Sequence, residues 1–152
     1  MSRPMAIQLR RATLGDAETI AAVFSPSFRL LTFLPALHTL AEDRWFIEHI
    51  VLRDCEVLLA ERDSIAVAFL ARQGDEVRLL YVHPDNLRSG AGTQLLAAAK
   101  AGRDILELWC FQANTPARRF YERHGFRAVR FTDGARNEEK MPDVRYRWER
   151  HA

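Results

Sequence analysis

Three strand-like segments follow one another in the middle of the chain, and they constrain its fold more than any other feature. Residues 56–61, 64–72 and 77–83 are apolar or β-branched at many positions, and the short turns 62–63 and 73–75 separate them. Segments of this length between turn residues predict strands. Because the connections are too short for a crossover, the strands must form an antiparallel meander.

Helices and further strands are expected on both sides of the meander. A first strand (7–11), a helix that ends near Ser25-Pro26 and a second helix (41–52) precede it, and after it we expect helices at 90–102 and 115–124 and strands at 105–111, 126–132 and 143–149. We therefore predict an α+β fold, in which helices flank a mixed, mostly antiparallel central sheet. The whole chain, 1–152, is expected to be a single domain.

Composition and charge exclude several classes of function. Hydrophobic residues make up 48% of the chain and charged residues 28%, as in globular proteins. The net charge is only +2, and no basic run resembles a nucleic-acid arm, so we expect no nucleic-acid partner. No apolar stretch resembles a membrane span or a secretory signal, so we expect a cytoplasmic protein without a membrane partner. The two cysteines and five histidines show no metal-ligand spacing, and we expect no metal.

A glycine-containing loop, residues 87–93, lies between the third strand of the meander and the next helix. Gly90 and Gly92 at the mouth of that helix allow backbone N–H groups to point at an anion, aided by the helix dipole. A Walker loop is excluded because no Lys follows Gly92, and a dinucleotide fingerprint because Leu95 replaces its third glycine. The loop therefore indicates a phosphate site of another kind, although two glycines before a helix also occur in ordinary turns.

A second motif spans residues 114–126, between a strand and the strand after it. Asn114 can cap the helix, Pro116 suits its first turn and Gly125 can end it, which are structural roles. The spacing of Asn114, Ala117, Tyr121 and Gly125-Phe126, downstream of the glycine loop, forms a more specific pattern.

Together the two motifs resemble those of the GNAT superfamily of N-acetyltransferases. Residues 80–92 are similar to its pyrophosphate-binding motif and residues 114–126 to its second coenzyme A motif, and the resemblance covers residues 76–131. One position departs from the family, whose loop usually opens with Gln or Arg, because Leu87 stands there with Arg88 beside it. Backbone amides bind the phosphates in such loops, so we expect binding to survive.

The resemblance implies an acyltransferase that uses acetyl-coenzyme A as co-substrate and a small-molecule or peptide amine as acceptor. The amine is expected to attack the thioester directly within a ternary complex. A homodimer is a further expectation, because the family often pairs through its late strands. The implied cofactor-binding residues lie on the strand, the loop and the following helix, and they are Leu80, Tyr81, Val82, Leu87, Arg88, Ser89, Gly90, Ala91, Gly92, Thr93, Asn114 and Ala117.

The resemblance also assigns catalytic residues. Tyr121 corresponds to the family's usual general acid, because a phenol with a pKa near 10 can protonate a departing thiolate; the alternative is a core aromatic. Glu76 lies where some members keep a catalytic glutamate, and the alternative is a solvated residue at a strand start. Glu107 and His38 are weaker candidates, and a proton relay through water needs no single base. Cys110 has no activating neighbour in the sequence and is expected to be inert.

The acceptor is expected between two loops. The segment 28–40 offers an apolar wall, and in the loop 135–143 Glu138, Glu139 and Asp143 can attract a cationic amine, unless these carboxylates are merely solvated.

Two alternative functions stay open. The first is a non-catalytic GNAT-like module that only binds coenzyme A. The presence of Tyr121 and of both loop glycines argues against it, and the unusual Leu87 argues mildly for it. The second is an unrelated nucleotide-binding protein. The glycine loop argues against it, because it lacks both the lysine of a Walker loop and the third glycine of a dinucleotide fingerprint.

Overall fold

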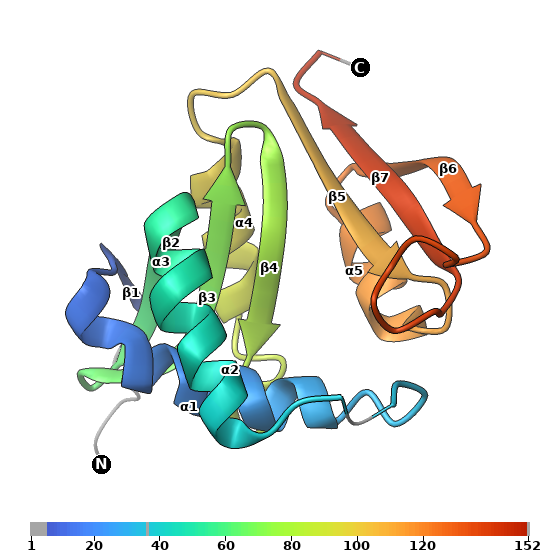
Figure 1. Cartoon of the computed structure of the whole chain (residues 1–152). Coiled ribbons are helices and arrows are strands. Elements are labelled where there is room, and N and C mark those ends of the chain that lie inside the picture. The colour runs from blue at the N-terminus through green and yellow to red at the C-terminus, as the bar shows by residue number, and fades with distance from the viewer. Residues whose placement is uncertain (1–5, 36, 152) are drawn as a thin grey trace.

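A seven-stranded sheet forms the centre of the computed structural model, which describes residues 6–35 and 37–151 (Figure 1). The strand order is β1-β2-β3-β4-β5-β7-β6, and every neighbouring pair is antiparallel except β4 with β5. The strands are β1 (Gln8–Arg11), β2 (Glu56–Arg62), β3 (Ile65–Gln73), β4 (Glu76–Val82), β5 (Ile105–Phe111), β6 (Arg127–Thr132) and β7 (Asp143–Glu149). The predicted α+β class with a mixed, mostly antiparallel sheet is confirmed.

Helices cover both faces of this sheet (Figure 1). On one face lie α1 (Ala17–Arg29), preceded by the turn η1 (Leu14–Asp16), and the consecutive segments α2 (Leu40–Phe46), η2 (Ile47–Val51) and α3 (Leu52–Asp54). On the other face lie α4 (Ala91–Lys100), which follows the turn η3 (Pro84–Asn86), and α5 (Thr115–Arg123). Within the described residues, no helix has the length and apolar character needed to cross a bilayer.

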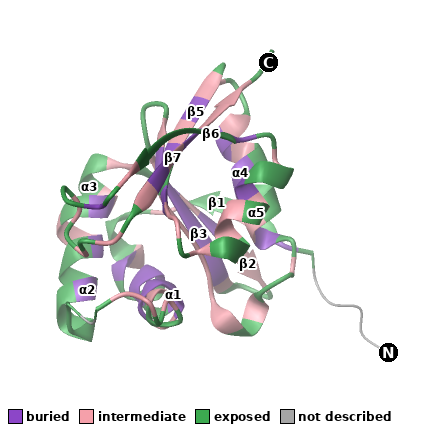
Figure 2. Cartoon of the chain, turned by 90° about the vertical axis from the view of Figure 1, so that its right-hand side faces the viewer, coloured by how far each residue is buried: buried purple, intermediate pink, exposed green. Residues whose placement is uncertain are grey.

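The core therefore consists of two apolar layers, one on each face of the sheet (Figure 2). Leu95 and Leu96 of α4 pack in one layer, and Ile20 of α1 packs with Phe69 of β3 in the other. Five consecutive residues of β3, 67–71, are buried, because β3 lies between neighbouring strands and has helices on both faces.

Two helices differ from the sequence-based expectation. Helix α1 continues through Pro26 to Arg29 instead of ending at Ser25-Pro26. Proline leaves the carbonyl four residues earlier without its helical partner, but Ala22 is exposed, so water can solvate that carbonyl. The hydroxyl of Ser27 lies 2.5 Å from the Val23 carbonyl of the same helix and 2.9 Å from the Val82 carbonyl, so the last turn of α1 lies against the end of β4.

The expected helix 41–52 exists, but a π-helical segment, η2, interrupts its regular winding. Ile47 and Val51 of this segment are both buried in the core cluster that contains α1. A pattern of apolar residues at helical spacing does not distinguish this winding from a regular α-helix.

Candidate active site

Strands β4 and β5 begin as a parallel pair and then move apart (Figure 1). In the described part of the chain their register contains one pair, Glu76 with Glu107. There the N–H of Glu107 donates to the Asp75 carbonyl at 2.8 Å. Beyond this point the two strands enclose an opening, which we call the gap.

A β-bulge in β4 accompanies the separation. Val77 is paired with Arg72 of β3, whereas Leu79 is paired with the adjacent Ala71, so Arg78 is an extra residue on β4. A bulge bends its strand and increases the local twist, which turns the rest of β4 away from β5.

Backbone groups near the end of β4 point into the gap. The N–H of His83 donates to the Val67 carbonyl at 2.8 Å and so faces β3. Because backbone direction alternates along a strand, the N–H and C=O groups of Leu80 and Val82 face away from β3. The hydrogen bond from the Ser27 hydroxyl to the Val82 carbonyl agrees with this direction.

The gap contains a cavity of about 100 Å³, lined by both strands and by α5. Asn114, Ala117 and Tyr121 line it from one face of the helix, as their spacing of three and four residues requires. The Asn114 side chain also caps α5 by accepting the N–H of Ala117 at 3.2 Å. The structure thus brings both sequence motifs to the same opening. The backbone of Tyr81, in contrast, is directed to β3, and its side chain lines the cavity.

The glycine loop lies beside one end of the gap and forms the floor of a wide groove of about 1360 Å³. All seven predicted loop residues, 87–93, line this groove. Gly90, immediately before α4, has φ 88°, a left-handed conformation that glycine adopts without strain. The N-terminal N–H groups of α4 therefore open toward the groove.

Three arginine side chains line the same groove, and we call this site the arginine groove. Arg88 comes from the loop, and Arg119 and Arg123 come from α5. None of the three makes an ion pair with another described residue, which leaves their charges available for an anion. The sequence analysis missed Arg119 and Arg123; their separation by four residues on an exposed helix face was the available signal.

Tyr121 projects from α5 toward the gap and is 9% exposed. Its ring packs against Phe126 and Tyr146, with centroid distances of 5.7 and 6.2 Å, so its position is fixed. Burial raises the pKa of Tyr121 well above its usual value, and nearby Cys110 and Tyr81 raise it further. The phenol therefore keeps its proton through the neutral pH range. Tyr121 is therefore both a packed core aromatic and a residue that lines the gap.

Glu76 lies at the closed end of the gap, where β4 and β5 are still paired. Its carboxylate accepts from Arg145 Nη1 at 2.6 Å, and Arg145 also donates to Glu107 at 3.2 Å. Arg78 Nε lies 3.6 Å from the other oxygen of Glu76. Both glutamates considered as bases are therefore held by the same guanidinium, a contact that joins β4, β5 and β7.

Cys110 of β5 lies on the wall of the gap. Burial raises the pKa of its thiol to about 12, so the thiolate needed for nucleophilic attack is scarce at neutral pH. This environment agrees with the expectation that Cys110 is inert.

A pocket of about 630 Å³ adjoins the gap on the face of the sheet that α1 and α2 cover, and we call it the aromatic pocket. The gap and this pocket share Tyr81 of β4 and Trp109 and Phe111 of β5 as lining residues. The two loops expected around an acceptor meet here, because His38 Nε2 lies 2.5 Å from Glu138 Oε1.

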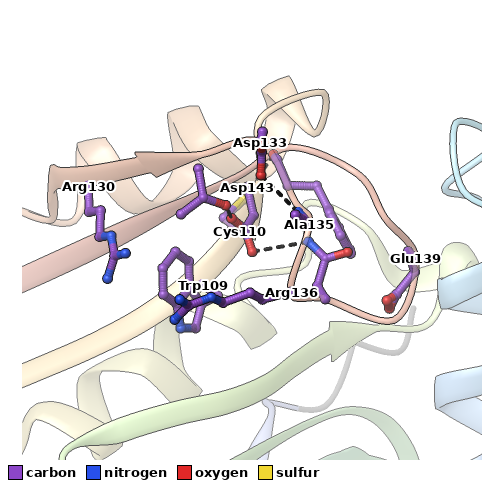
Figure 3. A pocket seen from close by; sticks show the side chains of 11 residues that line it. Trp109, Cys110, Arg130, Asp133, Ala135, Arg136, Glu139 and Asp143 are labelled. Atoms are coloured by element: carbon purple, nitrogen blue, oxygen red, sulfur yellow. Dashed lines mark hydrogen bonds between the residues drawn. The ribbon is translucent and has the colours of Figure 1, made fainter.

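A neighbouring pocket of about 510 Å³ lies between β5, β6 and the loop 133–142 (Figure 3). Arg136 extends toward the Trp109 ring, and Glu139 lies at the far side of the loop. Glu139 lines both this pocket and the aromatic pocket. Asp143 binds Thr132 and accepts from the Asn137 amide at 3.2 Å, so it anchors the loop.

Comparisons with known proteins agree with this geometry. A family model described as an acetyltransferase (GNAT) domain matches residues 53–128, half of the chain. An uncharacterized N-acetyltransferase of Methanocaldococcus jannaschii is 32% identical over 100 residues. That match covers 55% of this chain and 44% of the relative, so the chain spans less than half of the relative's length.

Solved structures extend the likeness to nearly the whole chain. A GCN5-related N-acetyltransferase from Rhodopseudomonas palustris has a TM-score of 0.79 and 25% identity, with 98% of this chain and 99% of that chain covered. The PaiA N-acetyltransferase from Thermoplasma acidophilum, solved in complex with coenzyme A, has a TM-score of 0.73 and 22% identity, with 95% and 99% covered. At 22% identity, the similarity to PaiA shows a shared fold.

Proposed function

We propose that this chain, which belongs to the GNAT acetyltransferase family, transfers the acetyl group of acetyl-coenzyme A to a primary amine. One observation carries the proposal: the gap between β4 and β5 lies between the aromatic pocket, on the α1 and α2 face of the sheet, and the arginine groove, on the α4 and α5 face. A thioester with an anionic tail and an amine can therefore meet inside the gap from opposite sides.

The arginine groove would hold the phosphates. Its backbone N–H groups suit phosphate oxygens. Arg88, Arg119 and Arg123 add positive charge and form no ion pair with a described residue, and one carboxylate, Glu122, lines the groove with them. The backbone groups of Leu80 and Val82 would then bond the extended arm of the co-substrate, as an edge strand bonds an added strand. The structure of PaiA with coenzyme A is the related case in which this kind of ligand is bound.

The reaction needs one bond made and one bond broken. The amine nitrogen attacks the thioester carbon, the C–N bond forms, and the C–S bond breaks as the oxygen is stabilised by a backbone N–H of β4. The Tyr121 hydroxyl donates its proton to the departing sulfur, and the group that accepts the amine's proton later returns one to the phenol through water. Tyr121 suits this role because it reaches the gap from a fixed position and is protonated at neutral pH.

Glu76 is the proposed acceptor of the amine's proton, acting through water. Glu76 lies next to the aromatic pocket, because Arg78 lines that pocket and its Nε lies 3.6 Å from the Glu76 carboxylate. The hydrogen bond from Arg145 opposes this role, because a proton on Glu76 would replace a charge-assisted contact.

Two measurements together test the proposal. Native mass spectrometry of the purified chain with acetyl-coenzyme A should detect the complex, and a free-thiol assay with a panel of primary amines should detect its turnover. Binding without thiol release from any amine would favour the non-catalytic module. The absence of both would contradict the proposal.

A further inference from the structure

The aromatic pocket concentrates aromatic side chains to an unusual degree. Seven of the fifteen aromatic residues of the chain (nine Phe, three Trp and three Tyr) line it. Phe24 and Phe28 come from α1, and Trp45 and Phe46 come from α2. The remaining three aromatic residues, Tyr81, Trp109 and Phe111, also line the gap, so the aromatic wall continues to the site of acyl transfer.

Several of these rings remain open to solvent. Trp45 is 55% exposed, Trp109 is 44% exposed and Phe46 is 36% exposed. Exposed apolar surface gathered in a concave site gains free energy when a ligand covers it, at about 25 cal/mol per Å². A volume of about 630 Å³ lies within the range of small-ligand pockets and far exceeds the cavity in the gap.

Acidic side chains give the pocket its charge. Asp43, which is buried, is neutralised by Arg29 at 2.9 Å, and Glu138 is bound to His38. Glu139, in contrast, has no ion pair or hydrogen bond with a described residue, although it is partly buried. Its negative charge acts on Tyr81, where it adds to the effect of burial in raising the pKa of that phenol.

Arg78 provides the opposing charge in the pocket. Its guanidinium is directed toward Glu76, at 3.6 Å, and donates to Gln73 at 2.7 Å. An unpartnered carboxylate therefore lies beside the aromatic entrance to the gap, and the arginine that lines the same pocket, Arg78, is already engaged with Glu76 and Gln73.

We propose that the acceptor is a small primary amine with an aromatic body, an arylalkylamine. Its ring packs among the α1, α2 and β5 aromatic side chains, and Glu139 binds its ammonium group as it arrives. After this nitrogen has released a proton to water, the neutral amine enters the gap between Tyr81 and Trp109. The inference rests on the proposed acetyl transfer. Aromatic rings stack favourably beyond their buried area, and a carboxylate next to the rings selects a cation. An acceptor with its own carboxylate would be repelled by Glu139.

The test measures kcat/KM for a panel of acceptors at saturating acetyl-coenzyme A. We expect 2-phenylethylamine and tryptamine to exceed n-butylamine, spermidine, phenylalanine and a short peptide with a free N-terminus by about tenfold or more. A preference for spermidine or the peptide would overturn the inference and leave acetyl transfer intact. If no amine releases thiol while acetyl-coenzyme A still raises the melting temperature, the arylalkylamine assignment fails although co-substrate binding holds. If that shift is also absent, the proposed function fails.

Two glutamate variants locate the ammonium site. Glu139→Gln should raise the KM for 2-phenylethylamine about tenfold and leave the KM for acetyl-coenzyme A unchanged. Glu18→Gln, an exposed residue in the first turn of α1, is the matched control and should change neither value. Equal effects of the two variants would contradict the role of Glu139.

A second copy of the chain is the alternative occupant of the aromatic pocket. Light scattering of the wild type and of Trp45→Ala distinguishes it. A dimer that dissociates in Trp45→Ala would show that the exposed rings form a protein interface, and it would overturn the inference.

Discussion

His38 and Glu138 lie one hundred residues apart in the sequence, and their side chains meet at 2.5 Å. The contact joins the segment after α1 to the loop between β6 and β7, so it closes one side of the aromatic pocket. Both partners are exposed, and the contact therefore reports on the position of the two loops rather than on the stability of the core.

The first prediction is that this contact depends on pH. The hydrogen bond that His38 donates to Glu138 raises the pKa of His38 above its usual value, so the folded protein binds the proton more tightly than the unfolded chain does. The ion pair is fully present below the unfolded value, near 6.5, and is lost as the pH rises through the raised value. An NMR titration should find the higher pKa in the wild type and a lower one in Glu138→Gln. Identical titrations in the two proteins would show that the pair does not form in solution.

The second prediction concerns Gly134, in the loop 133–142. Its φ is 81°, and a Cβ atom there would overlap the backbone of Met141, so Gly134→Ala must move the loop. We expect a loss of about 1–3 kcal/mol in the free energy of unfolding, measured in urea, and a higher acceptor KM. Gly74→Ala is the control, because Gly74 has φ 59° but open space around it. A loss no larger than that of the control would contradict the predicted overlap.

The third prediction tests the arginine groove. Arg119→Gln and Arg123→Gln should each weaken acetyl-coenzyme A binding about three- to tenfold at low salt, and the difference from the wild type should shrink as salt is added. Isothermal titration calorimetry at two ionic strengths measures both effects. Arg53→Gln, an exposed residue of α3, is the control and should bind like the wild type. Unchanged affinity in both groove variants would remove these residues from the site.

The sequence predicted much of the fold and less of the site. Strands β5 and β7 have the expected bounds, because buried and more exposed side chains alternate along them and turn or loop residues flank them. The predicted end of α1 was wrong, because the helix continues past Pro26 and buries Ser25 and Ser27 against other elements; Ser25 donates to Asp43 of α2 at 2.8 Å. Local patterns carry no information about such contacts.

The site shows the same limit. Motif spacing predicts that Tyr121 and the glycine loop belong to one site; Tyr121 lines the gap and the loop lines the arginine groove beside it. The bond between Glu76 and Arg145, 69 residues apart, could not be predicted, because it depends on β7 lying next to β5 in the sheet. The same topology decides which of the scattered arginines keep a free charge.

The fourth prediction concerns the proposed base. Glu76→Gln should lower kcat by about 10²–10⁴ with little change in the melting temperature, if the carboxylate receives the amine's proton. Glu107→Gln is the matched control, because Glu107 is bound to the same Arg145 guanidinium. A purely structural role predicts equal and small effects of the two variants on kcat. That result would leave proton removal to water.

Replacement of Tyr121 by Phe tests the central claim most directly. Phenylalanine keeps the ring that packs against Phe126 and Tyr146, so the variant removes only the hydroxyl from the gap. We predict that kcat falls by about 10²–10⁴ while the Kd of acetyl-coenzyme A and the melting temperature stay near the wild-type values, because the proton is needed only as the thiolate departs. The comparison must be made where the chemical step limits the rate. Wild-type turnover in Tyr121→Phe under those conditions would contradict the account and leave Tyr121 as a packing residue of α5.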